Sequence, residues 1–146
     1  MPVEHTYTIV CDDIRREDNG KLIVLGMYIG TLTVPMLPFV FPTLTVVSLF
    51  KGDKPESFSW RLSIQNLESN HQLVAEARGF ATVPAPGPGV MPVKFAGLPV
   101  TQAGAYNIVF EIEGQREPLA ITPITIVLMP QVMPGQVHPQ PPFSRP

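Results

Sequence analysis

The sequence is poor in charge: charged residues make up 15% of its 146 residues, against about 25% in typical globular chains. Polar cover of the surface is therefore thin, and we expect self-association or a protein partner to hide some apolar surface. The net charge is only −2 and no basic stripe is present, so the electrostatic footprint of a nucleic-acid-binding protein is missing.

Cysteine is almost absent as well. Cys11 is the one cysteine, which excludes an intramolecular disulfide and suits a reducing compartment. The first residues lack the basic and apolar regions of a secretory signal, and no apolar run reaches the roughly 20 residues that span a bilayer. We therefore expect a cytoplasmic protein without a membrane segment.

Several sequence motifs of catalysis and cofactor binding are missing. No C-x-x-C or H-x-x-x-H pair is present to begin a zinc site. Neither a G-x-S-x-G elbow nor a G-x-x-x-x-G-K-[ST] phosphate loop occurs. We expect a protein that is not an enzyme and that holds no cofactor or metal.

Helical periodicity is also lacking, and alternation of apolar and polar residues takes its place. The clearest cases are residues 58–65 and 106–113, where every second side chain is apolar. The other segments rich in β-formers are residues 6–12, 21–34, 43–50, 72–83, 93–97 and 118–129. About seven or eight strands at such spacing predict an all-β fold, an antiparallel β-sandwich that is loosely immunoglobulin-like.

Glycine and proline mark where strands bend or stop. Gly26 and Gly30 interrupt a strand segment and predict bulges or bends. Residues 84–89 alternate proline with other small residues and predict an extended loop. We expect the sandwich domain to cover residues 1–129, followed by a proline-rich, extended or disordered tail over residues 130–146.

The alternation also assigns structural roles to single residues. Trp60 and Leu62 from one strand are expected to fill the inner sides of the stacked sheets. Ile108 and Phe110 from another strand are expected to do the same. Tyr106 follows a glycine and an alanine at the start of a strand, which predicts a tyrosine corner, a buried hydroxyl bonded to upstream backbone.

Four acidic residues form a cluster at the first turn of the chain. They are Asp12, Asp13, Glu17 and Asp18. Clustered carboxylates can bind a hard cation such as Ca²⁺. Their spacing, however, does not match a calcium loop, and Arg15 and Arg16 lie among them. We expect a solvated turn with local ion pairs, and a metal site built from these four residues is the alternative.

Cys11 is the candidate nucleophile. A catalytic cysteine needs a nearby base and a partly exposed, electropositive setting. His5 and His71 are the available bases, and nothing in the sequence places either beside Cys11. We expect a buried thiol, and an enzyme centred on these residues is a third interpretation.

The candidate interaction residues lie in an apolar segment that prolines interrupt, residues 35–42. They are Met36, Leu37, Phe39, Val40 and Phe41. Pro35, Pro38 and Pro42 withhold backbone donors, so we do not expect a central strand here. Without a strand ladder to bury them, these side chains either close one end of the sandwich as a lid or form a partner or self-association patch.

Two parts of the sequence resemble a known family. Residues 11–28 read as a short strand, a charged turn and a strand that begins with Gly-Lys-Leu. Residues 104–106, Gly-Ala-Tyr, precede an apolar alternation near the end of the domain. In these features the chain resembles the uncharacterised bacterial family DUF6941. The resemblance implies a β-sandwich and supplies no catalytic residues.

The function itself is not visible in the sequence. The leading interpretation is a non-enzymatic β-sandwich that acts by protein–protein contact or self-assembly, although fold alone does not establish that role. A small-molecule or carbohydrate-binding module is the alternative. The expected partner is a protein or a second copy of the chain, with neither nucleic acid nor a membrane involved.

Overall fold

A computed structural model describes residues 3–84 and 87–130 of the chain. In these residues there are nine strands and one short 3-10 helix, so the predicted all-β class is confirmed. The elements are β1 (Val3–Arg16), β2 (Leu22–Tyr28), β3 (Thr31–Val34), β4 (Phe39–Gly52), β5 (Glu56–Asn66), η1 (Leu67–Ser69), β6 (Gln72–Val83), β7 (Pro88–Val100), β8 (Gly104–Ile112) and β9 (Ala120–Leu128).

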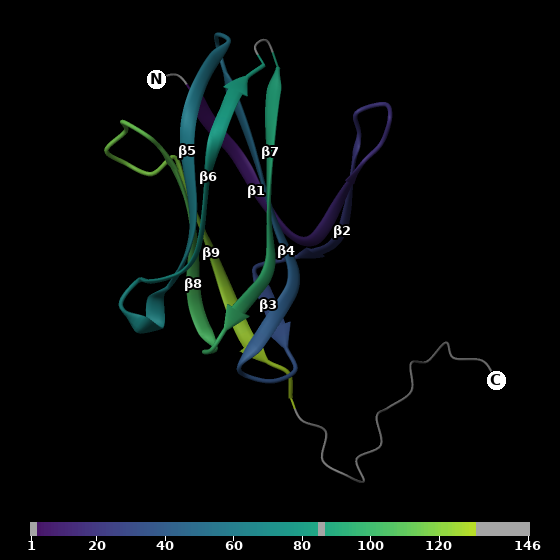
Figure 1. Cartoon of the computed structure of the whole chain (residues 1–146), viewed down its shortest axis with the longest axis vertical. Helices are drawn as coiled ribbons and strands as arrows, with labels where there is room; N and C mark the ends of the chain where they lie inside the picture. Colours follow the sequence, from purple (N-terminus) through teal and green to yellow (C-terminus); the bar gives the residue numbers. More distant parts are fainter. Residues whose placement is uncertain (1–2, 85–86, 131–146) are drawn as a thin grey trace, which may run out of the picture.

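The strands form two sheets that lie face to face as a sandwich (Figure 1). The first sheet has the order β2-β1-β4-β7, and the second has the order β3-β9-β8-β5-β6. Neighbouring strands are antiparallel except β3 and β9, which are parallel. The β-sandwich prediction is therefore confirmed, with one parallel pair at an edge of the second sheet.

The segment predicted as one interrupted strand, residues 21–34, is two strands in different sheets. β2 ends at Tyr28, and the chain then crosses to the second sheet, where β3 begins at Thr31. Gly30 permits the crossing because its φ is +75°, a conformation that side chains with a Cβ rarely adopt. This division accounts for nine strands where about seven or eight were expected.

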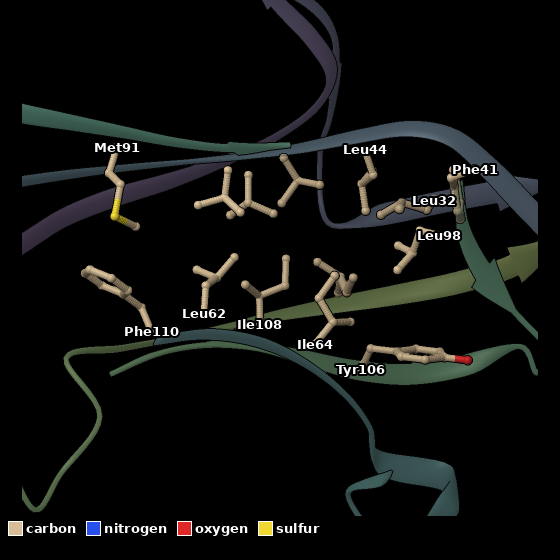
Figure 2. Close-up of a cluster of buried hydrophobic side chains, with 14 of the residues drawn as sticks. Leu32, Phe41, Leu44, Leu62, Ile64, Met91, Leu98, Tyr106, Ile108 and Phe110 are labelled. Atoms are coloured by element: carbon tan, nitrogen blue, oxygen red, sulfur yellow. The ribbon is translucent and has the colours of Figure 1, made fainter. Parts of the chain in front are cut away.

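The core lies between the sheets (Figure 2). Leu62 on β5 and Ile108 and Phe110 on β8 point from the second sheet toward the first, with Phe110 opposite Met91 on β7. All of them are buried, as the alternation predicted. Trp60 lies on the same face of β5 but is only partly buried, packing against the margin of the core.

The prediction that residues 35–42 do not form part of a central strand is wrong for residues 39–42, whereas residues 35–38 lie outside the strands. β4 begins at Phe39 and lies between β1 and β7 in the first sheet. Pro42 fits there because β1 pairs with β4 only as far as Thr45. Residues 39–43 therefore pair with β7 alone, and the second edge of β4 requires no donor from Pro42.

The remaining proline-rich segments lie at the limits of the described residues. The predicted loop over residues 84–89 is shorter than expected, because β7 already begins at Pro88 and pairs there with Lys51. The predicted tail, residues 130–146, lies outside the described residues except for Pro130. Within the described part of the chain, no helix is long and apolar enough to cross a membrane.

Candidate interaction surface

The predicted interaction residues are divided between the surface and the interior. Met36 and Val40 are exposed, the latter at 54%, whereas Phe41 is only 4% exposed. Leu37 and Phe39 are half-buried against the core. Because Phe41 belongs to a paired strand, alternation turns its ring inward, where it contacts Phe39 edge to face at 4.9 Å. Phe41 is therefore a core residue and lies outside any exposed patch.

Of the acidic cluster, Asp13 forms local ion pairs of the kind that the sequence predicted. Asp13 accepts from the Lys94 ammonium at 2.7 Å and lies 3.7 Å from the Arg15 guanidinium. The hydrogen bond from Lys94 holds the pKa of Asp13 below its ordinary value. Asp12 accepts a hydrogen bond of 2.5 Å from the Tyr28 hydroxyl. Burial, followed by this bond, raises the pKa of Tyr28 to about 12.

The described part of the chain holds no cluster of side chains that could bind a metal ion. Across the described residues, no group of three histidine, cysteine, aspartate or glutamate side chains comes together. Glu17 and Asp18 lie in the exposed turn after β1. At the base of the turn, Asp13 is therefore ion-paired and Asp12 is bonded to a tyrosine hydroxyl.

Cys11 is buried, as expected for a small apolar side chain. Burial raises the pKa of its thiol, and the neighbouring carboxylates Asp12 and Asp13 raise it further. His5 is bonded instead to the Thr8 hydroxyl at 2.7 Å. It lies six residues from Cys11 along β1, a span of roughly 20 Å in an extended strand. The structure does not bring this histidine to the thiol.

The centre of the outer face of the second sheet is polar. Arg61 on β5 donates to Glu76 on β6 at 2.8 Å and to Glu111 on β8 at 2.9 Å. These bonds raise the pKa of Arg61 and lower that of Glu76. Ser57 and Thr82 form a cross-strand hydroxyl pair at 3.0 Å on the same face. Two large apolar side chains, Phe80 on β6 and Ile121 on β9, are exposed on this face as well.

The outer face of the first sheet is apolar by contrast. Directly paired residues share a face, so the pairs Cys11–Met27 and Ile9–Val47 lie on the side opposite the core-facing Val46. Val47 is buried although it does not belong to the core cluster. The exposed apolar residues on this face are Tyr7, Ile23, Leu25, Met27 and Val90.

These residues concentrate on a two-stranded ribbon, which we call the β1–β2 arm, residues 12–28. Figure 1 shows β1 bending so that its second half and β2 leave the body of the sandwich. β2 makes substantial contact with β1 only. Ile23, Leu25 and Met27 are 43%, 40% and 56% exposed, and they form what we call the arm surface.

The sequence carried a signal for the arm surface. Residues 22–29 are all apolar or glycine, without alternation. A continuous apolar run is typical of a strand that is covered on both faces. In the structure β2 has the composition of a strand covered on both faces, but within the described chain its side chains Ile23, Leu25 and Met27 remain exposed.

Two hollows accompany these surfaces. One, of about 450 Å³, lies on the second sheet and is lined by Trp60, Arg61, Arg78, Glu113 and Gln115, among others. The indole N–H of Trp60 is buried and has no hydrogen-bond partner among the described residues. The other, of about 470 Å³, lies between the tip of the β1–β2 arm and the neighbouring ends of β6 and β7.

Comparison with known proteins identifies a family and no activity. No curated protein matches the chain. Among solved structures, a β-glucosidase from Erythrobacter marinus matches with 11% identity and a TM-score of 0.49. The match covers 86% of this chain and 15% of the glucosidase, and it carries no information on activity. A family profile covers residues 6–127, so the chain belongs to DUF6941, a family of unknown function, as the sequence resemblance indicated.

Proposed function

We propose that this chain is a non-enzymatic interaction module that works through protein–protein contact or self-assembly, with the arm surface as its binding site. The observation that carries the proposal is the exposure of Ile23, Leu25 and Met27 on one face of a ribbon. Exposed apolar groups that adjoin one another are typical of interaction sites, because water disfavours them until a partner covers them.

The composition of the arm surface resembles the centre of a protein interface. Interface centres are depleted in charge and enriched in large apolar side chains, including methionine, and a polar rim surrounds them. Here Arg15 and Asp13, which pair with Ile23 and Leu25 across the two strands, supply polar side chains along one border. On the outer face of the second sheet Arg61 and its two glutamates occupy the centre. The exposed apolar side chains Phe80 and Ile121 lie apart from one another there, on β6 and β9.

The cellular setting is part of the same proposal. A sandwich of loosely immunoglobulin-like type, working in the bacterial cytoplasm, agrees with the single buried thiol Cys11. The chemistry proposed is binding alone, without a cofactor, a nucleic acid or a membrane.

The experiment compares the wild type with Leu25→Lys/Met27→Lys in affinity capture from the native cytoplasm and in light-scattering mass measurement. The matched control is Ile121→Lys, which charges a side chain that is 55% exposed on the outer face of the second sheet. We expect the double variant to lose a partner or an oligomer that the wild type and the control retain. Identical behaviour of all three folded proteins would overturn the proposal.

A second candidate function is binding of a small molecule or carbohydrate in the hollow beside Trp60. Its volume of about 450 Å³ lies within the roughly 300–1,000 Å³ of typical ligand sites. Trp60 forms part of its wall, although its indole N–H is buried and has no hydrogen-bond partner among the described residues. Because Trp60 is the one tryptophan, quenching or a shift of its fluorescence on titration with a sugar panel tests this function. An unchanged spectrum throughout the panel counts against it.

A further inference from the structure

We infer that β2 pairs edge to edge with β2 of a second copy of this chain, antiparallel about a two-fold axis at Leu25. This inference rests on the proposed function and names the partner of the arm surface. It follows from three observations: the state of the four sheet edges, the self-complementarity of β2, and the charges at the two ends of the arm.

The four edge strands differ in their protection against pairing. Exposed edges are protected in natural sheets by short length, by charged side chains or by proline. β3 is only four residues long, β6 carries the charged Glu76 and Arg78, and β7 carries Pro92, Lys94 and Pro99. β2 has seven residues with neither charge nor proline, and no strand in the described chain pairs with its outer edge.

The sequence of β2 is complementary to itself in the antiparallel direction. Leu25 is the middle residue of Leu22–Tyr28, so an axis at Leu25 pairs the whole strand with its copy. In this register Ile23 lies opposite Met27 of the second copy, and Leu25 lies opposite Leu25. Apolar side chains therefore meet apolar side chains on the exposed face, and the unpaired backbone groups of both edges gain partners.

The charges of the arm favour a second copy in the antiparallel direction. At the tip, Arg15, Arg16 and Lys21 outnumber Glu17 and Asp18. At the base, Asp12 and Asp13 outnumber Lys94, which reaches across from β7.

Antiparallel pairing sets each positive tip beside the other copy's negative base, whereas parallel pairing sets tip beside tip. The net charge of −2 opposes the approach of two copies only weakly. The second copy is therefore a partner whose charge pattern fits this edge.

Cysteine cross-linking tests the geometry. Opposed residues in an antiparallel pair have Cα atoms about 4.5–5.5 Å apart, which a disulfide can bridge. We expect Leu25→Cys to form a disulfide-linked dimer under mild oxidation. The matched control is Ile23→Cys, which lies on the same face and has similar exposure. In the proposed register the two Ile23 positions of the dimer are four residues apart along the strand, so their Cα atoms are separated by at least about 14 Å. Native Cys11 is buried and does not interfere.

Each cross-linking result decides the proposed pairing. A dimer with Leu25→Cys and little with Ile23→Cys supports the axis at Leu25. Equal cross-linking of both variants shows random collision and overturns it. The absence of a dimer with Leu25→Cys overturns it as well.

Mass in solution separates this inference from the proposed function. We expect the wild type to form a dimer, a species of twice 16.0 kDa, at about 100 μM. Leu25→Lys should raise the dissociation constant of the dimer at least about tenfold, because two ammonium groups meet on the axis. Ile121→Lys should behave as the wild type. A monomeric wild type whose captured partner is lost in Leu25→Lys would overturn the pairing and leave the proposed function intact. If Leu25→Lys alters neither mass nor partner capture, both fall.

Discussion

The hydroxyl of Tyr106 donates a hydrogen bond of 2.6 Å to the backbone carbonyl oxygen of Gln102, four residues upstream. The tyrosine side chain is buried, and burial raises the pKa of its hydroxyl. The side-chain oxygen of Gln102 in turn accepts from Asn66 at 2.7 Å and from Ser69 at 2.6 Å. The predicted tyrosine corner is confirmed, and it ties the turn before β8 to the end of β5 and to η1.

We expect Tyr106→Phe to lower the free energy of unfolding by about 1–2 kcal/mol, because the substitution leaves the carbonyl of Gln102 without its donor. Urea denaturation monitored by Trp60 fluorescence measures the change. Tyr7→Phe is the matched control, since Tyr7 is exposed and no side-chain hydrogen bond involves it in the described residues. Equal stability of the two variants would contradict a structural role for the Tyr106 hydroxyl.

Truncation to alanine should affect stability strongly at Phe41 and very little at its neighbour Val40. Phe41→Ala removes a buried ring and is expected to cost about 3–5 kcal/mol of stability. Val40→Ala, at an exposed position, should stay within about 0.5 kcal/mol of the wild type. Thermal and urea unfolding of both variants check the assignment of Phe41 to the core. A stable Phe41→Ala protein would restore Phe41 as a candidate for a surface role.

Gly79 lies beneath the ring of Trp60. A Cβ added at Gly79 would lie 2.5 Å from the Cζ2 atom of Trp60, so the indole must move or the strands must separate. We expect Gly79→Ala to cost about 1–3 kcal/mol, the range for overpacked sites. In a Trp60→Leu background the same change should cost much less, and a double-mutant cycle in urea measures the coupling. Equal costs in both backgrounds would disprove the close packing.

The bond between Arg61 and Glu76 makes stability depend on pH in the acid range. Because Arg61 lowers the pKa of Glu76 in the folded state, the unfolded chain binds protons more readily as the pH falls. This contribution is complete above the ordinary pKa of 4.5 and is lost as the pH falls through the lower, folded value.

Urea midpoints measured between about pH 3 and pH 7 test this dependence, because the slope below pH 4.5 should be shallower in Arg61→Gln. Arg78→Gln is the control, since Arg78 is 3.8 Å from Glu76 and mostly exposed. An unchanged acid slope in Arg61→Gln would exclude Arg61 as the cause.

The strands and their inner faces could be predicted because alternation is a local property. Residues 58–65 needed no knowledge of their partners to show which side of the strand is apolar. The corner at Tyr106 was equally local, since its acceptor lies four residues away. The outcome for Phe41 was different, because its burial depends on pairing with Leu98, more than fifty residues further along the chain.

Local sequence was enough to predict the all-β class and the core positions of Leu62, Ile108 and Phe110, because a period of two residues separates an apolar from a polar side. The burial of Cys11 was predicted separately, from the tendency of free cysteine to be buried. Which strands lie at the edges of the sheets, by contrast, could not be read from local sequence. Strand order results from pairings between distant segments, and it places β2 at the end of the first sheet. The same apolar sequence between β1 and another strand would be ordinary core, whereas at an open edge its side chains and backbone groups are left for a partner.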